Sequence, residues 1–131
     1  MKFISPTLHG VLDYLMCGFF LMLPSVYSLS GSASTVCFVL AAGYLLISLC
    51  TNMPFGLVGW IPFWVHGGFE LVSGVIFIAS PWIFNFVHTA HNSPDFVLRT
   101  IFIGVGVVFL LVYAFTQWRP AAGVDTTAAT A

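Results

Sequence analysis

Four long apolar stretches, separated by short polar segments, dominate this sequence. None of them has the polar face of a soluble helix or the alternation of a half-buried strand. A helix of about 20 apolar residues crosses the hydrocarbon core of a bilayer. The pattern therefore predicts an all-α fold, a four-helix transmembrane bundle, with helices at about residues 7–28, 34–53, 62–86 and 95–118.

Turn-forming residues mark the ends of these stretches. Ser5-Pro6 is typical of a helix N-cap followed by proline in the first turn. Asn52-Met53-Pro54 ends the second stretch. We therefore expect two helical hairpins, at 1–58 and 59–118, followed by a polar, disordered tail at 119–131.

Composition narrows the class of protein. Of 131 residues, 60% are hydrophobic and only 5% are charged, with three Lys or Arg and four Asp or Glu. Soluble domains are about 25% charged, and three dispersed cations cannot neutralise a run of phosphates. A soluble monomer and a nucleic-acid-binding protein are thereby excluded. The expected partners are the lipid bilayer and either other membrane subunits or further copies of this chain.

An internal repeat relates the two hairpins. The segments 7–13 and 64–70 both contain His-Gly-x-x-acid, at an offset of 57 residues. The pairs matched at this offset are His9 and His66, Gly10 and Gly67, Asp13 and Glu70, and Pro24 and Pro81. Each hairpin crosses the membrane twice, so the second begins on the side where the first began. The repeats are therefore parallel, and both His-acid pairs lie in the same leaflet.

On a helical wheel, each His shares one stripe with its acid and with small residues, such as Gly74 in the third stretch. Small residues allow membrane helices to pack closely. Ionisable residues within a span face protein or water rather than lipid. We therefore expect both stripes to face the inside of the bundle.

The candidate polar site consists of His9 with Asp13 and His66 with Glu70. Three main roles stay open for it, besides binding of a lipid headgroup or a small ligand. The pairs could form a structural clamp between helices. They could bind a metal, either as two axial ligands of a haem or as two His and two carboxylates around a divalent ion. They could also respond to protons. The first role needs no cofactor, and a haem or a divalent metal is the alternative.

Other polar residues give weaker signals. His88, His91 and Asp95 cluster near the opposite interface and could bind zinc. The three cysteines lie inside the predicted spans without C-x-x-C spacing, so we expect them to pack as small apolar residues. The sequence has no phosphate-binding glycine loop and no evident nucleophile, base and acid set, so we do not expect an enzyme.

Ser80-Pro81-Trp82 closes the first helix of the second hairpin. With the early His-Gly-x-x-acid pattern, it resembles the SPW-repeat family of small bacterial membrane proteins built from paired transmembrane helices. The resemblance covers about residues 5–118, although the first hairpin has Leu23-Pro24-Ser25 at the equivalent place. It implies a paired-helix fold in a bacterial cytoplasmic membrane and no established reaction. A looser likeness to acid-resistance membrane proteins is consistent with proton sensing.

Positive charges predict the orientation. Lys2 and Arg119 would share one side, and Arg99, one turn after Asp95, would lie near the other. Two cations against one predict that both termini are cytoplasmic. The leading functional expectation is a non-catalytic structural or accessory protein, acting as a homo-oligomer or as a subunit of a larger membrane complex.

Overall fold

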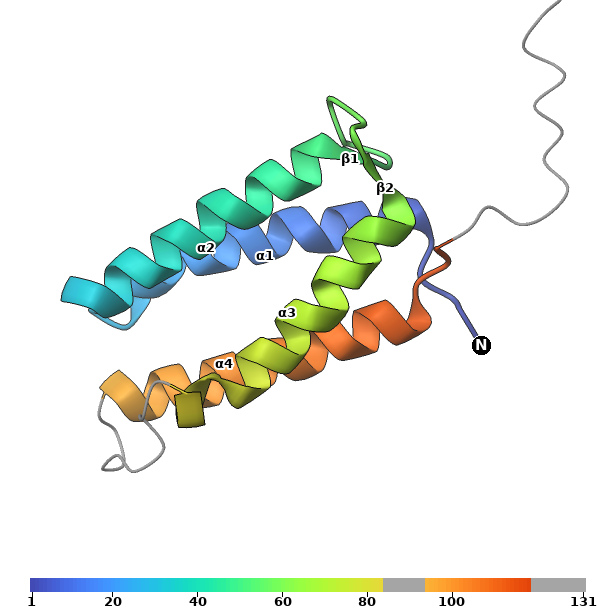
Figure 1. Cartoon of the computed structure of the whole chain (residues 1–131). Helices are drawn as coiled ribbons and strands as arrows, with labels where there is room; N and C mark the ends of the chain where they lie inside the picture. Colours follow the sequence, from blue (N-terminus) through green and yellow to red (C-terminus); the bar gives the residue numbers. More distant parts are fainter. Residues whose placement is uncertain (84–93, 119–131) are drawn as a thin grey trace, which may run out of the picture.

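The structure is a computed structural model and describes residues 1–83 and 94–118. These residues form four helices, α1 (Pro6–Val26), α2 (Gly31–Cys50), α3 (Phe63–Ile83) and α4 (Pro94–Phe115), and two short strands, β1 (Thr51–Asn52) and β2 (Ile61–Pro62). α1 packs beside α2, and α3 packs beside α4 (Figure 1). The predicted all-α four-helix bundle is confirmed.

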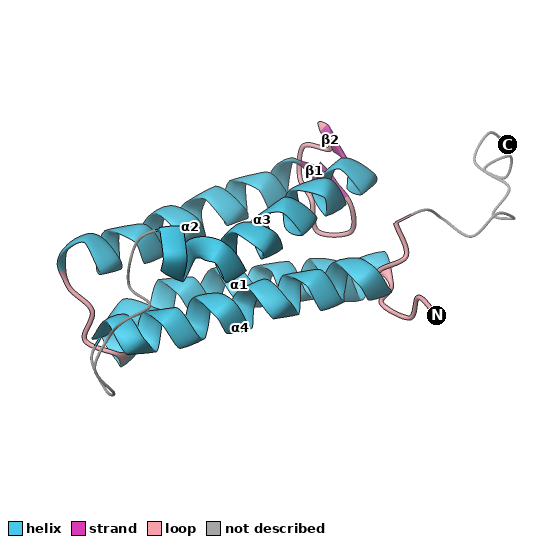
Figure 2. Ribbon diagram, turned by 60° about the horizontal axis from the view of Figure 1, so that its bottom comes forward, coloured by secondary structure: helices cyan, strands magenta, loops and turns pink. Residues whose placement is uncertain are grey.

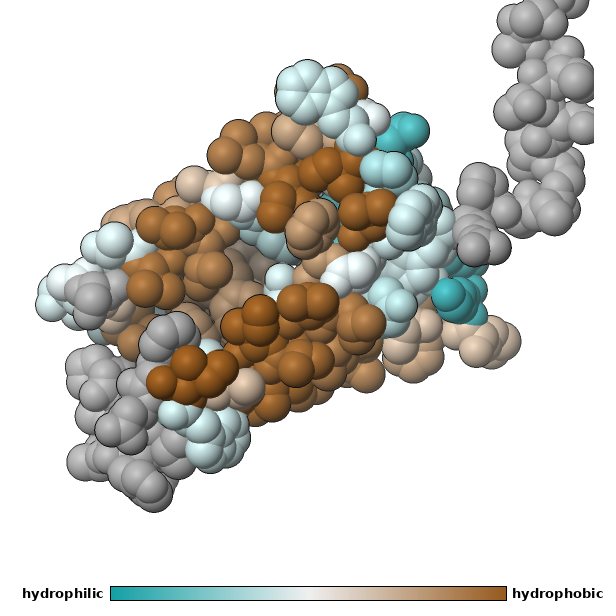
Figure 3. All heavy atoms as spheres, in the orientation of Figure 1, coloured by the Kyte–Doolittle hydropathy of each residue, from teal (hydrophilic) through white to brown (hydrophobic). Residues whose placement is uncertain are grey.

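All four helices are long and apolar enough to cross a membrane. Large apolar side chains are exposed along their outer faces, among them Leu15, Val39, Val72 and Leu111. Figure 3 shows apolar residues over most of the helical surface, with paler and hydrophilic residues near the end that carries β1 and β2. Such a surface is stable against lipid rather than water. The chain is therefore a multi-pass membrane protein.

The described helix ends lie close to the predicted ones, although α1 ends at Val26 rather than 28 and α2 begins at Gly31 rather than 34. Ser5 caps α1 as predicted, and its hydroxyl accepts a hydrogen bond from the Leu8 backbone N at 3.2 Å. α2 and α4 end at Cys50 and Phe115 rather than at 53 and 118. The reason is that the residues directly after them enter short β pairings. The tail at 119–131 and the predicted end of the third helix beyond 83 lie outside the described residues.

These β pairings join the two hairpins crosswise. Thr51 at the end of α2 lies opposite Ile61 at the start of the second hairpin, in a parallel pair. Thr116 at the end of α4 forms an equivalent parallel bridge with Ile4 at the start of the first hairpin. Both links lie at the end of the bundle that also holds the N-terminus (Figure 2). At this end of the bundle, the segment after the last helix of each hairpin is therefore paired with the segment before the first helix of the other.

The repeat is visible in the buried face of α1 and α3. Every buried residue of α1 has a buried counterpart in α3 at the offset of 57. The pairs are His9 and His66, Gly10 and Gly67, Asp13 and Glu70, Cys17 and Gly74, Phe20 and Phe77, Leu23 and Ser80, and Pro24 and Pro81. Phe20 and Phe77 stack with ring centroids 5.7 Å apart. The two stripes thus face the inside of the bundle, as expected.

Close packing of α3 on α4 requires glycine at one position. A Cβ on Gly106 would lie 2.6 Å from Cγ1 of Ile78 and 2.7 Å from the backbone O of Gly74. We expect Gly106→Ala to destabilise the protein by about 1–3 kcal/mol, because the helix backbones must separate. Thermal unfolding in detergent measures this. Gly104→Ala is the matched control, since nothing lies within 4 Å of its Cβ. Equal effects of the two changes would contradict this account.

Candidate functional site

The four residues of the predicted polar site come together at the closed end of the bundle. The exposed fractions of His9, Asp13, His66 and Glu70 are 0%, 2%, 1% and 2%. One potential ligand atom from each residue can be chosen so that all four atoms lie within 4.8 Å of one another. Two histidines and two carboxylates from α1 and α3 therefore form a single buried cluster.

The histidines face the carboxylates through Nε2. His9 Nε2 lies 3.5 Å from Asp13 Oδ1 and 3.6 Å from Glu70 Oε1. His66 Nε2 lies 3.3 Å from Asp13 Oδ2. Charge-assisted N–H···O bonds are about 2.7–2.9 Å long. These contacts are longer, and neither Nε2 atom has a hydrogen-bond partner.

A threonine fixes the orientation of each imidazole. The Thr116 hydroxyl donates its hydrogen to the Val112 carbonyl at 2.7 Å and lies 3.0 Å from His9 Nδ1. A hydroxyl has one hydrogen, so Thr116 must accept a hydrogen bond from the His9 Nδ1–H. In a neutral imidazole, Nε2 then carries a free lone pair, which points into the cluster.

The second histidine has the same support. Thr51 donates to the Ile47 carbonyl at 2.7 Å, and its oxygen lies 2.9 Å from His66 Nδ1. Thr51 belongs to the first hairpin and His66 to the second, whereas Thr116 belongs to the second hairpin and His9 to the first. Each hairpin thus orients the histidine of the other.

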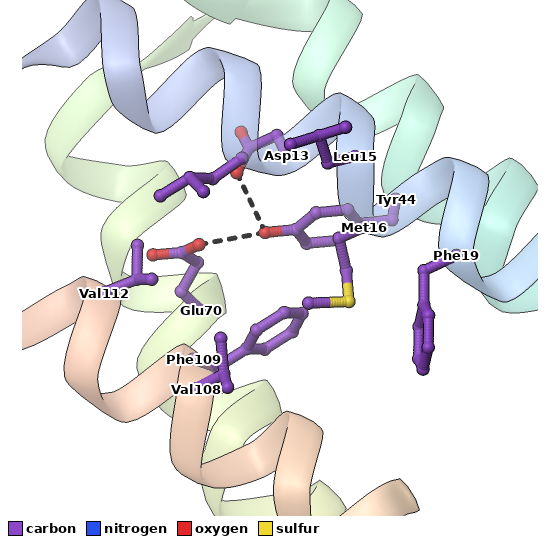
Figure 4. Close-up of a pocket in the computed structure, with 10 residues that line it drawn as sticks. Asp13, Leu15, Met16, Phe19, Tyr44, Glu70, Val108, Phe109 and Val112 are labelled. Atoms are coloured by element: carbon purple, nitrogen blue, oxygen red, sulfur yellow. Dashed lines mark hydrogen bonds between the residues drawn. The ribbon is translucent and has the colours of Figure 1, made fainter.

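Tyr44 of α2 reaches both carboxylates. Its hydroxyl lies 2.9 Å from Glu70 Oε1 and 3.2 Å from Asp13 Oδ1, and it donates its one hydrogen to either of them (Figure 4). Ser48, one turn further along α2, donates to Asp13 Oδ2 at 3.4 Å. These contacts hold the two carboxyl groups side by side.

Aromatic rings close the site toward the end of the bundle. Phe63 and Trp118 pack edge-on against His9, with ring centroids 5.1 and 4.9 Å away. Gly67 makes room for Trp118, because a Cβ there would lie 2.9 Å from the indole ring. Gly10 approaches the Pro54 carbonyl in the same way, at 2.8 Å from its would-be Cβ. Trp118, at the predicted end of the fourth helix, thus lies after α4 and covers the site.

Known proteins add nothing to this geometry. No protein-family model matches the chain, and neither a curated protein nor a solved structure matches it. The resemblance to the SPW-repeat family therefore rests on Ser80-Pro81-Trp82 and the repeat alone, and it stays a prediction.

The remaining sequence candidates lie elsewhere. Gly74 packs against α4, with a would-be Cβ 3.1 Å from the Gly106 carbonyl. Ser80 and Pro81 are buried near the far end of α3, and Trp82 is exposed there. Pro24 occupies the equivalent place in α1. The possible zinc site at His88, His91 and Asp95 involves side chains outside the described residues.

Sequence analysis missed the residues that orient the site, namely Thr51, Thr116, Tyr44 and Ser48. One signal was available for the threonines. Each directly follows the last residue of α2 or α4, and each is followed by a residue with a side-chain amide, Asn52 or Gln117. No comparable signal marks Tyr44, because Phe109 stands at the corresponding depth in α4 and stacks on it, with centroids 5.2 Å apart.

Proposed function

We propose that this multi-pass membrane protein binds one divalent transition-metal ion between its two hairpins, and that the ion has a structural, non-catalytic role. The observation that carries the proposal is the pair of inward-facing Nε2 lone pairs, oriented by Thr116 and Thr51, 3.3–3.6 Å from carboxylate oxygens.

The spacing of the cluster suits a tetrahedral ion. Zinc binds His nitrogens and carboxylate oxygens at about 2.0–2.2 Å, so neighbouring ligand atoms of a tetrahedral site are about 3.4 Å apart. The three contacts of His9 and His66 with the carboxylates fall between 3.3 and 3.6 Å, and one atom from each of the four residues lies within 4.8 Å of the others. These atoms are too far apart for strong direct bonds and well spaced for an ion between them.

Charge balance also favours a divalent metal ion in the cluster. A carboxylate inside a membrane span costs several kcal/mol unless it is paired. Asp13 and Glu70 are both buried, and the basic side chains within contact distance of them among the described residues are His9 and His66, which carry charge only when protonated. With neutral imidazoles, a divalent cation brings the net charge of the cluster to zero. The site then holds no unpaired charge in the low-dielectric interior.

A single ion fits the cluster better than a haem does. Axial ligation would place the porphyrin between the Nε2 atoms of His9 and His66, where Asp13 and Glu70 lie within 3.3–3.6 Å. A mixed set of imidazole and carboxylate ligands suits Zn²⁺, Fe²⁺ or Mn²⁺. The threonine hydroxyls provide the outer hydrogen bonds that metal-bound histidines need. The proton-responsive alternative stays a prediction.

Cobalt tests the proposal directly. We expect the full chain, purified in detergent and stripped with a chelator, to take up one Co²⁺ per chain and to develop the visible absorption of a four-coordinate site. Stoichiometric Zn²⁺ should displace it. Elemental analysis of the untreated protein should find about one divalent metal ion per chain. Absence of both signals would refute the metal site.

The proposal also covers the membrane in which the protein lies, its orientation there and its accessory role. The resemblance to the SPW-repeat family supports a bacterial cytoplasmic membrane, and Lys2 and Arg119 support cytoplasmic termini. The accessory role rests on the apolar outer helix faces, which suit packing against lipid or against other subunits. Native mass measurement after gentle extraction would identify a homo-oligomer or a larger complex.

A further inference from the structure

A second feature adjoins the cluster, namely an apolar pocket of about 320 Å³. Its volume falls within the usual range of small-molecule sites, about 300–1,000 Å³. The walls come from α1 and α4, which belong to different hairpins, and the base comes from the polar cluster. Leu15, Met16 and Phe19 of α1 and Val108 and Phe109 of α4 line the walls, and Glu70 lies at the base beside Tyr44.

The mouth of the pocket opens toward lipid. Its rim residues Leu15, Phe19 and Val108 are 64%, 41% and 43% exposed, on helix faces that the membrane surrounds. α1 packs chiefly on α2, and α4 chiefly on α3, so the backbones of α1 and α4 make few close contacts at the seam that holds the pocket. A molecule dissolved in the bilayer can therefore enter without crossing water.

One polar atom at the base is left for a ligand. Glu70 is 2% exposed, its Oε1 accepts from Tyr44, and its Oε2 is buried without a hydrogen-bond partner. Figure 4 shows the second oxygen pointing away from Tyr44, on the side of Val112. A buried carboxylate oxygen without a partner costs free energy. A hydroxyl donor entering the pocket would satisfy it.

The walls favour a flat ring next to that hydroxyl. Tyr44 and Phe109 stack with ring centroids 5.2 Å apart, and Met16 and Phe19 of α1 also line the pocket (Figure 4). Aromatic faces and a thioether form favourable contacts with an aromatic ring. Beyond them, the exposed apolar rim suits an alkyl tail that continues into the bilayer.

We propose that this pocket binds a lipid-soluble phenol, with the ring between α1 and α4 and the hydroxyl donating to Glu70 Oε2. The site does not depend on the metal, because the cluster's histidines face Asp13 and Glu70 Oε1. Its acceptor is the oxygen that neither Tyr44 nor His9 contacts.

Radiolabelled para-heptylphenol tests the proposal, with the full chain in nanodiscs and empty nanodiscs as the partitioning control. We expect saturable binding at one site per chain. The methyl ether of the same phenol keeps the shape and lacks the donor, so it should compete at least about tenfold more weakly. Competition by the ether as strong as by the phenol would overturn the proposal, as would binding no greater than to empty nanodiscs.

Adjacent residues of α4 provide a matched pair of variants. Val107 and Val108 are both 43% exposed, and only Val108 lines the pocket. Val108→Trp should abolish saturable phenol binding, and Val107→Trp should leave it unchanged. On α1, Leu15 and Leu21 are both exposed, and only Leu15 lines the pocket. Leu15→Trp should therefore abolish saturable phenol binding, and Leu21→Trp should leave it unchanged. Native binding in both Val108→Trp and Leu15→Trp would refute the site, and unchanged helix content and thermal unfolding show that each variant folds.

Discussion

Replacing His66 with glutamine should abolish stoichiometric metal binding while the four helices still form. Glutamine preserves most of the side-chain volume and can still hydrogen-bond to Thr51, but it does not supply the Nε2 lone pair that faces Asp13 at 3.3 Å. Loss of a partner outside the ligand shell already costs about 10–100-fold in metal affinity. Loss of a ligand should therefore cost more than about a hundredfold, measured by Co²⁺ titration against a competing chelator.

A control for this change lies on the same helix. Ser80 is a buried polar residue of α3 that donates to the Phe77 carbonyl at 2.7 Å, far along the helix from the cluster. Ser80→Ala should keep native metal affinity, although it also removes a buried polar group. His9→Gln should behave as His66→Gln, because the two positions are equivalent in the repeat. Native affinity in either His variant would contradict the ligand assignment.

Replacing Thr51 with valine should lower metal affinity by about 10–100-fold without removing any ligand. Valine matches the shape of threonine, but the His66 Nδ1–H then has no acceptor in the buried site. The imidazole is freed to rotate or to change tautomer, and Nε2 no longer points reliably at the ion. Co²⁺ titration measures the metal affinity. Thr51→Ser should keep most of the native affinity, because serine retains the hydroxyl that accepts from His66.

Thr100 provides the matched control for Thr51. Its hydroxyl donates to the Phe96 carbonyl four residues earlier, as the Thr51 hydroxyl does to Ile47, but it lies on an exposed face of α4. Thr100→Val should leave metal affinity unchanged. Equal losses in Thr51→Val and Thr100→Val would show that the effect comes from the helix and not from the histidine.

The sequence predicted the helices and the cluster better than the groups that complete the site. Continuous apolar runs and Ser5-Pro6 determine helix positions locally, so the helices could be read from the pattern. The offset between His9 and His66 also indicated that both His-acid pairs lie at one depth. These are statements about each helix and its counterpart, and they need no knowledge of how the hairpins pack.

The residues that sequence analysis missed are positioned by contacts between segments that lie far apart in the chain. Thr116 lies 107 residues from His9, and Tyr44 lies 26 residues from Glu70. A threonine in an apolar span usually donates its hydroxyl hydrogen to a carbonyl of its own helix. The sequence does not show that its oxygen also accepts a hydrogen bond from a histidine on another segment. Only the crosswise packing of the hairpins reveals that role. The short β pairings directly after α2 and α4 were missed for the same reason, because the paired residues, Ile61 and Ile4, come from the other hairpin.

The crosswise support of the two histidines has a consequence for biogenesis. During synthesis the first hairpin enters the membrane with His9 and Asp13, but the threonine that orients His9 is Thr116, near the end of the described chain. No complete site exists until the last helix has inserted and the hairpins have associated. If the cluster binds a metal ion as proposed, the ion is acquired only after assembly, and metal-loaded protein would then mark chains whose insertion is finished.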